Sequence, residues 1–436
     1  MERDIYKKLQ KWKTFYRRKP LILNGSRQVG KTYALEHFAK ESYEKYAYFN
    51  FEKDKTLSSF FTESLDPKEL IKNLSIHSSI DIEPENTLII FDEIQECDEA
   101  LNSLKYFCEE AGDYHIAAAG SLLGIKVAGG KGFPVGKVNF MNLFPLNFFE
   151  FLTATDNGRL REYLETITEL SPLPDPHHNN LKKLLKYYCY VGGMPEAVSE
   201  YISHEKLDVV REVHLELLFA YEKDFAKHAP LNQITKITTI WNQIPEELAK
   251  ENKKFIFANI RKSARSRDYE EAIQWLLDAG LIYKSDRIET PKVPLTSYRN
   301  SNIFKLFFID VGLLGAMCRL SAKTMIDGDK LFTEFKGAFT ENYVAQELKA
   351  VGCKDLFYWA SQGEAEVDFV LEIGGKVFPL EAKAGVNKKK KSLLIFGEKY
   401  KPMSLLRSTL MNLKQDKNIK NYPLYMVKEI LKSEEA

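Results

Sequence analysis

The stretch Gly25-Ser26-Arg27-Gln28-Val29-Gly30-Lys31-Thr32 fits the pattern G-x-x-x-x-G-K-[ST], which is typical of phosphate-binding loops. It follows the apolar run 21–23 and precedes a stretch of helical character at 33–40, so a strand, a loop and a helix are expected in that order. Gly25 and Gly30 allow the backbone to curl with its N–H groups pointing inward, around phosphate oxygens. A chance match in a glycine-containing turn is the alternative, and the strand–loop–helix context argues against it.

The loop residues have distinct expected roles toward ATP and Mg²⁺. All eight residues 25–32 are predicted to contact the nucleotide. Lys31 can reach the β- and γ-phosphates, and the Thr32 hydroxyl can bind Mg²⁺. The N-terminus of the following helix adds a partial positive charge beside the phosphates.

Composition narrows the class of protein. The 436 residues are too many for one hydrophobic core, so about two to four domains are expected. Lys plus Arg (62) nearly balance Asp plus Glu (61), so net charge does not predict nucleic-acid binding by the whole chain. Five scattered cysteines without a C-x-x-C pair fit a reducing cytosol, and neither a signal peptide nor a membrane span is expected.

Strand and helix signals alternate from residue 21 to about 150, which predicts a parallel α/β sheet. The expected strands are 21–24, 46–51, 87–91, 115–119 and 137–143. The third is a continuous apolar run, as expected for a central strand buried on both faces. Before the sheet, residues 4–18 predict an amphipathic helix whose apolar face carries Ile5, Leu9, Trp12 and Phe15 or Tyr16.

Asp92 and Glu93 directly follow the buried strand 87–91. An acidic residue at the carboxyl end of a central strand, beside a phosphate loop, is where bound Mg²⁺ needs a partner. Asp92 is predicted to fill that role, and Glu93 to act as the general base that polarises the attacking water. A surface turn after a strand is the alternative interpretation.

Other parts of a hydrolytic site are less defined by the sequence. Strand 115–119 runs into Ser121, whose hydroxyl could contact the γ-phosphate or instead cap a helix. An arginine usually stabilises the transition state of phosphoryl transfer. The sequence does not single one out among Arg27, Arg159, Arg161, Arg261, Arg265 and Arg267, and a neighbouring subunit is another source.

The middle of the chain is expected to be helical. A Pro-rich loop with His177 and His178, interpreted as solvated rather than metal-binding, is followed by helices at 181–190, 194–203 and 206–227. A winged helix is predicted from the size and order of the next elements. They are helices at 256–264 and 268–279, followed by strands 281–284 and 304–310, which can pair as a wing. Arg261, Lys262, Arg265 and Arg267 could contact DNA phosphates, although acids on the second helix would repel them.

The last hundred residues predict a helix at 332–350 and strands at 356–359, 366–373, 376–382 and 422–428. Gly374-Gly375 indicates a hairpin. Asp368 lies on its first strand, while Glu381 and Lys383 are two apart on the second and share one face. This is the pattern of PD-(D/E)xK nucleases, in which two carboxylates hold Mg²⁺ and the lysine orients water. A hairpin with a surface salt bridge is the alternative interpretation.

Several motifs, in order, resemble prokaryotic AAA-type (AAA_14) ATPases with a C-terminal DUF4143 domain. They are the loop 25–32, Phe-Asp-Glu-Ile-Gln (91–95), Ala-Gly-Ser-Leu-Leu-Gly (119–124), Phe-Pro-Val-Gly-Lys-Val (133–138), Phe-Pro-Leu (144–146) with Phe-Glu-Phe (149–151), Tyr-Val-Gly-Gly-Met-Pro (190–195), Lys-Lys-Phe (253–255), Trp-Leu-Leu-Asp-Ala-Gly-Leu (275–281) and Asp-Val-Gly-Leu-Leu (310–314). The resemblance covers essentially the whole chain. It implies an ATPase core, a winged-helix middle and a restriction-endonuclease-like end, in which Glu341 matches the upstream acid.

The expected organisation is an N-terminal helix (1–20), a P-loop ATPase core of AAA/ASCE type (21–155), a helical region (156–230), a winged-helix-like domain (231–320) and a nuclease-like domain (328–436). One hypothesis is a Mg²⁺-dependent ATPase whose nucleotide state controls DNA cleavage by Glu341, Asp368, Glu381 and Lys383, with Asp368 and Glu381 holding a second Mg²⁺. Another is an ATP-switched binding module that does not cut. A small-molecule kinase would leave the other domains idle. ATP, DNA and further copies of the chain are the expected partners.

Overall fold

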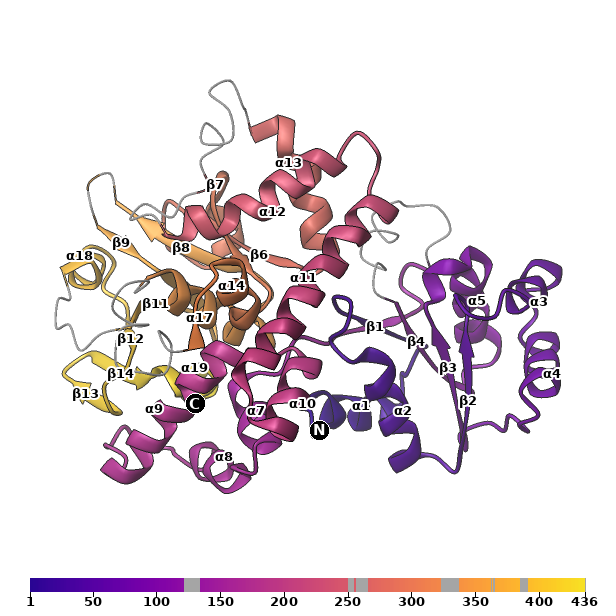
Figure 1. Cartoon of the computed structure of the whole chain (residues 1–436). Helices are drawn as coiled ribbons and strands as arrows, with labels where there is room; N and C mark the ends of the chain where they lie inside the picture. The colour runs from indigo at the N-terminus through magenta and orange to yellow at the C-terminus, as the bar shows by residue number, and fades with distance from the viewer. Residues whose placement is uncertain are drawn as a thin grey trace. The chain divides into compact units, whose positions relative to one another are not determined.

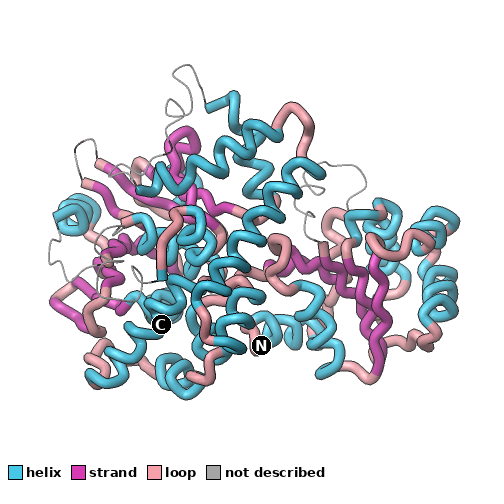
Figure 2. The backbone as a smooth tube through the Cα atoms, viewed as in Figure 1, coloured by secondary structure: helices cyan, strands magenta, loops and turns pink. Residues whose placement is uncertain are grey.

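The computed structural model describes residues 1–120, 134–249, 255, 266–322, 337–361, 363, 365–384 and 391–435. The chain forms two compact units (Figures 1 and 2). The first comprises Met1–Phe144 with Asp278–Gly280, and the second comprises Pro145–Leu277 with Leu281–Ala436. Among the described residues, no helix is both long and apolar enough to cross a membrane.

A five-stranded parallel sheet forms the centre of the first unit, in the order β2-β3-β4-β1-β5. Its strands are β1 (Leu21–Asn24), β2 (Lys45–Asn50), β3 (Thr87–Asp92), β4 (His115–Ala119) and β5 (Asn139–Asn142). The predicted α/β class and all five strands are confirmed, with ends that differ by a residue or two. This order places β4 between the strand that precedes the loop and the strand that ends at Asp92.

Helices cover both faces of this sheet. They are α1 (Ile5–Thr14), α2 (Lys31–Ser42), α3 (Leu57–Glu63), α4 (Pro67–Ser78) and α5 (Asp98–Glu110). Alternate strand residues such as Ile22, Phe49 and Ile89 form one buried cluster with apolar side chains of α3, α4 and α5. On the other face, α2 contacts β2, β3 and β4 and packs against α1. A strand whose residues are apolar on both faces, such as β3, is therefore completely buried.

The N-terminal helix is shorter than predicted. Ile5, Leu9 and Trp12 are buried as expected, but the helix ends at Thr14. Phe15 has an extended backbone and is 49% exposed, and Tyr16 is more exposed still. The predicted apolar face was wrong at these two positions because helical spacing no longer applies after Thr14.

The second unit begins with helices α7 (Phe148–Ala154), α8 (Gly158–Glu165), α9 (Asp175–Val191), α10 (Pro195–His204), α11 (Leu207–His228), α12 (Ile234–Ala249) and α13 (Ser266–Asp278). The predicted loop around His177 and His178 was wrong, because α9 already begins at Asp175 with Pro176 in its first turn, where proline is tolerated. His178 is buried, and its Nδ1 lies 2.6 Å from the Tyr425 hydroxyl. The predicted helix 256–264 lies outside the described residues.

A four-stranded sheet follows, in the order β7-β6-β8-β9. Its strands are β6 (Ile282–Ile288), β7 (Arg299–Phe308), β8 (Leu356–Ala360) and β9 (Glu366–Val367), and η3 (Leu295–Tyr298) lies between β6 and β7. β6 and β7 are antiparallel, as predicted for the wing, but β6 also pairs in parallel with β8. Strands from either side of residue 320 thus share one sheet, and the domain limits given above remain predictions.

A five-stranded mixed sheet completes the second unit, in the order β10-β11-β12-β14-β13. Its strands are β10 (Phe369–Ile373), β11 (Lys376–Lys383), β12 (Leu405–Thr409), β13 (Lys414–Asp416) and β14 (Ile419–Pro423), and the nearby helices are α14 (Val311–Met317), α17 (Ala338–Ala350), α18 (Lys391–Tyr400) and α19 (Val427–Glu435). The predicted hairpin is confirmed: Gly374 and Gly375 have φ of 55° and 73°, as a two-residue turn with two left-handed positions requires. The strand predicted at 422–428 was wrong after Pro423, where a 3₁₀ turn and α19 begin.

Candidate functional sites

The loop between β1 and α2 has the curled backbone that its sequence predicts. Gln28 and Gly30 have φ of 65° and 87°, both in the left-handed region, and α2 begins at Lys31. A Cβ on Gly25 would lie 2.4 Å from the carbonyl oxygen of Leu143, so only glycine fits there. The strand β1 and the chain just after β5 therefore meet at the first residue of the loop.

Lys31 lies over the loop and is only 7% exposed. Its Nζ donates hydrogen bonds to the carbonyl oxygens of Gly25 (2.9 Å) and Ser26 (2.8 Å). Burial lowers the pKa of Lys31 to about 8, although Glu93 and Asp92 oppose this shift. The Ser26 hydroxyl is buried as well and has no hydrogen-bond partner in the described part of the chain. A lysine resting on loop carbonyls and an unsatisfied hydroxyl are polar groups suited to phosphate oxygens.

Asp92 connects the end of β3 to the start of α2. The Thr32 hydroxyl donates to Asp92 Oδ2 over 3.0 Å. The same carboxylate oxygen accepts hydrogen bonds from the Tyr48 hydroxyl (2.6 Å) and from Asn50 Nδ2 (3.3 Å). Because the Thr32 proton is directed at Asp92, the lone pairs of its oxygen remain for a cation, so the donor set fits Mg²⁺.

Glu93 stands at the sharp turn that ends β3. Its φ of 50° is left-handed, and the 3₁₀ turn Ile94–Glu96 begins immediately after it. Gln95 Nε2 donates to the Glu93 carboxylate, and the Glu93 N–H donates to Asp92 Oδ1 over 3.1 Å. Glu93 is the stronger of the two acids that oppose the lowered pKa of Lys31, so its charge acts on the loop.

Not every predicted residue of the nucleotide site can be placed. Ser121, Arg261 and Arg265 lie outside the described residues. Arg161 on α8 is largely buried and pairs with Glu165 Oε1 over 3.0 Å. Arg27 lies close enough to Lys31 to lower the pKa of that lysine. No arginine is thereby identified as the one that would stabilise transferred phosphate.

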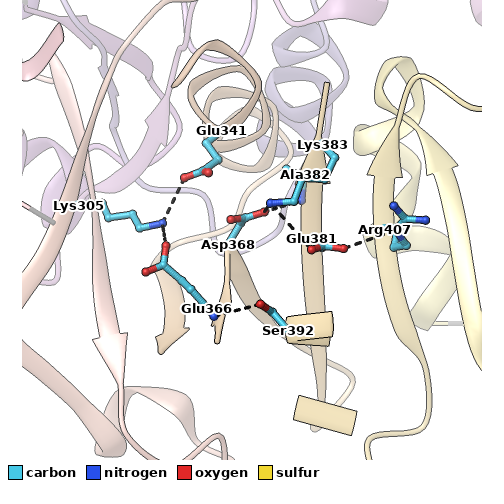
Figure 3. A network of polar contacts seen from close by, with 9 residues as sticks. All are labelled: Lys305, Glu341, Glu366, Asp368, Glu381, Ala382, Lys383, Ser392 and Arg407. Carbon is cyan, nitrogen blue, oxygen red and sulfur yellow. Dashed lines mark hydrogen bonds and ion pairs between the residues drawn. The ribbon is translucent and has the colours of Figure 1, made fainter. Parts of the chain in front are cut away.

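Most of the residues predicted as a nuclease centre in the C-terminal region lie close together (Figure 3). Asp368 lies between β9 and β10, whereas Glu381 and Lys383 lie on β11. Lys383 Nζ is 3.6 Å from Asp368 Oδ2 and 3.9 Å from Glu381 Oε1. The N–H of Ala382 donates to Asp368 Oδ2 over 2.8 Å, which fixes the carboxylate against the neighbouring strand. The structure thus brings three of the four predicted residues into one cluster.

Lys305 on β7, which the sequence analysis missed, pairs with Glu341 on α17 and with Glu366, two residues before Asp368. Its Nζ lies 3.2 Å from Glu341 Oε2 and 2.6 Å from Glu366 Oε1 (Figure 3). The lysine side chain is 0% exposed. Burial alone would lower its pKa, but Glu341 and Glu366 outweigh that effect and raise it. Its position inside the apolar run 303–309 is the sequence signal that could have identified a buried charge.

Lysine and arginine side chains balance much of the negative charge of Asp368 and Glu381. Arg407 on β12 lies with its Nε 3.5 Å from Glu381 Oε2. Burial raises the pKa of Glu381, while Lys383 and Arg407 oppose the shift. Lys383 is the most accessible of the cations, with a side chain 43% exposed against 2% for Arg407. Asp368 and Glu381 can supply oxygen ligands to a divalent ion, and Lys383 is the cation that such an ion would displace. Over the described ranges, no three His, Cys, Asp or Glu residues gather as a metal-binding group.

Three family models match successive parts of the chain. Residues 17–152 match an AAA domain, residues 182–324 match a domain of unknown function (DUF8612), and residues 336–427 match another (DUF4143). The AAA domain and the DUF4143 domain expected from the motifs are therefore confirmed, and the middle region corresponds to DUF8612. A comparison with curated proteins gave no match.

Solved structures that resemble the chain are distant. The Walker-type ATPase PABY2304 of Pyrococcus abyssi is 14% identical, with a TM-score of 0.43, and the match covers 72% of this chain and 94% of that one. The Orc1 protein of Aeropyrum pernix in complex with DNA is 13% identical (TM-score 0.30; 72% and 90% covered). AMPPCP-bound DnaA from Aquifex aeolicus is also 13% identical (TM-score 0.28; 63% and 85% covered). With TM-scores this low, none of these likenesses supports a statement about function.

Proposed function

We propose that the AAA domain at residues 17–152 is a Mg²⁺-dependent ATPase of the ASCE type. The hydrogen bond between Thr32 and Asp92 carries this proposal, because it joins the phosphate-binding loop to the acidic end of the central strand β3. ATP would lie against residues 25–32. Bound Mg²⁺ would be held by Thr32, with Asp92 as its partner, and would neutralise phosphate charge.

The residues of the loop and of β3 would divide the work of hydrolysis. Lys31 would leave the carbonyls of Gly25 and Ser26 and bind phosphate oxygens instead. Asp92 would keep the Thr32 hydroxyl oriented. Glu93, at the end of the same strand, would accept the proton of the attacking water as general base.

Glu93→Gln tests this assignment. The variant should bind ATP as the wild type does, because the loop is unchanged, but turnover should fall roughly 10²- to 10⁴-fold, the usual contribution of a general base. Binding is measured by calorimetry and turnover by phosphate release. Glu96→Gln, at the end of the 3₁₀ turn that follows Glu93, is the matched control and should retain turnover. Unchanged turnover in Glu93→Gln would remove Glu93 as the base.

A second candidate function is metal-dependent DNA cleavage by the C-terminal region, controlled by the nucleotide state of the AAA domain. The convergence of Asp368, Glu381 and Lys383 favours it. Asp368 and Glu381 would hold the metal ion, Lys383 would orient water, and Glu341 would support the site. The charge balance supplied by Lys305 and Arg407 instead favours a nuclease-like fold that binds a partner without cutting it.

Supercoiled plasmid separates the two possibilities. If the region cleaves DNA, the protein with Mg²⁺ or Mn²⁺ and ATP should nick the plasmid, and Asp368→Asn should abolish nicking. Asp355→Asn, at an exposed position before β8, is the matched control and should nick normally. If the unmodified protein does not nick the plasmid in the presence of ATP, the alternative of a binding module that does not cut DNA is supported. A reducing cytosol and association with further copies of the chain, one of which could supply an arginine, remain part of the proposal.

A further inference from the structure

We infer that Tyr48, supported by Asn50, is a positioning residue of the AAA domain that fixes the Asp92 carboxylate toward Thr32. The inference rests on the proposed ATPase function and deepens it. It assigns a role to β2, a strand that neither the phosphate-loop pattern nor the acid pair at the end of β3 includes.

The hydrogen bonds of Asp92 leave its carboxylate little freedom to rotate. Oδ2 accepts from Thr32 (3.0 Å), Tyr48 (2.6 Å) and Asn50 (3.3 Å), while Oδ1 accepts from the N–H of Glu93 (3.1 Å). The Tyr48 bond is the shortest of the four. Asp92 is only 4% exposed, so losing a donor is not readily made good by water.

Strand register explains why these side chains meet. β2 and β3 are parallel neighbours, with Asn50 paired to Asp92. Tyr48 and Asn50 are two residues apart and point to the same face of β2. A tyrosine hydroxyl is protonated throughout the neutral range, so Tyr48 donates its proton to Asp92 Oδ2.

Tyr48 is a cleaner test than Asn50. Asn50 Oδ1 also accepts the backbone N–H groups of Glu52 and Lys53, so its replacement would disturb the loop after β2. Tyr48→Phe removes one hydroxyl and keeps the ring. Tyr46→Phe is a matched control because Tyr46 is on the same strand and lines the same pocket as Tyr48. Among the described residues, the side-chain donors to Asp92 are Thr32, Tyr48 and Asn50.

Two measurements on the full chain test the inference. Tyr48→Phe should lower kcat roughly tenfold, the loss expected for one hydrogen bond to a charged group, with KM for ATP changed less than about threefold. Mg²⁺ should lower the dissociation constant of ATP, which calorimetry measures. Tyr48→Phe should raise the free Mg²⁺ concentration at which half of this effect is reached. Tyr46→Phe should match the wild type in both. In an Asp92→Asn background, Tyr48→Phe should have no further effect on Mg²⁺-linked binding.

The binding measurement does not need turnover. A wild type that binds Mg²⁺ and ATP but never releases phosphate would refute the proposed ATPase, and the Mg²⁺ dependence would still decide the role of Tyr48. Wild-type kcat and Mg²⁺ dependence in Tyr48→Phe would overturn the inference. Equal losses in Tyr46→Phe and Tyr48→Phe would also overturn it, since they would show a general effect on β2.

Discussion

The imidazole of His214 lies completely inside the second unit. Its Nε2 lies 2.9 Å from the carbonyl oxygen of Val191, and Arg211 donates to its Nδ1 over 3.4 Å. Nε2 therefore carries the proton of a neutral ring. Burial, reinforced by the positive charge of Arg211, lowers the pKa of His214 to about 3. Protonating this residue in the folded chain would place a buried positive charge beside the Arg211 guanidinium.

His214 should make the second unit sensitive to acid. Its folded pKa is below the unfolded value of about 6.5, so its stabilisation is complete above pH 6.5 and is lost as pH falls toward 3. From pH 7.5 to 5 the loss is about 2 kcal/mol. His214→Gln keeps a donor for Val191 but cannot titrate. Between pH 7.5 and 5, the free energy of unfolding of this variant, measured in urea, should therefore fall by about 2 kcal/mol less than that of the wild type. The same change at the exposed His204 should leave the pH dependence as it is.

At the scale of elements, the turn between α9 and α10 makes a close backbone contact, called the crossing below, with the segment before α7. Leu146 N–H donates to the carbonyl oxygen of Gly193 over 2.7 Å, and Gly193 N–H donates to the buried Asp310 over 2.6 Å. A Cβ on Gly193 would lie 2.0 Å from the carbonyl oxygen of Leu146. Three segments far apart in sequence therefore meet at a residue that must lack a side chain.

Gly193→Ala should destabilise the second unit by about 3 kcal/mol or more, because the clash is with backbone that cannot turn away. Gly158→Ala, at the start of α8, is the matched control. Nothing lies within 4 Å of the Cβ it would add, so its stability should be unchanged or slightly raised. Urea unfolding of both variants measures the difference. Similar stability in the two variants would mean that the crossing relaxes.

The local sequence pattern predicted where helices and strands form better than it predicted which strands pair with one another. The buried run of β3 and the Gly374-Gly375 turn are readable because each depends on neighbouring residues alone. The pairing of β6 with β8 depends on contacts some seventy residues apart, which propensity does not encode. The same reason hid Lys305, since only the folded chain shows which acids surround a lysine in an apolar strand. The loop, Asp92 and Glu93 could be proposed because strand ends in a parallel sheet share one edge.

At the scale of the whole molecule, the phosphate-binding loop lies in the first unit, and the cluster of Asp368, Glu381 and Lys383 lies in the second. The loop, β3 and Tyr48 all belong to the first unit, whereas Lys305 and the acids around it belong to the second. Ligands of either site should therefore stabilise their own unit first.

Differential scanning calorimetry should resolve this division as two unfolding transitions. Mg²⁺ with ATP at about 100 times the dissociation constant should stabilise the first unit by about 2.7 kcal/mol, because the nucleotide binds only the folded loop. The second transition should move little. Lys31→Ala should remove the shift. One transition that rises as a whole would instead show that the units unfold together.

The pocket that Tyr48 and Asn50 line has a practical meaning for chemical intervention. It holds about 650 Å³, and Tyr46, Phe49 and His77 give it aromatic walls. A small molecule seated there would contact Tyr48 and Asn50, which both donate to Asp92, while the residues that line the pocket include none of the phosphate-binding loop. Such a compound would be a noncompetitive inhibitor, and a library screened at saturating ATP would select for it.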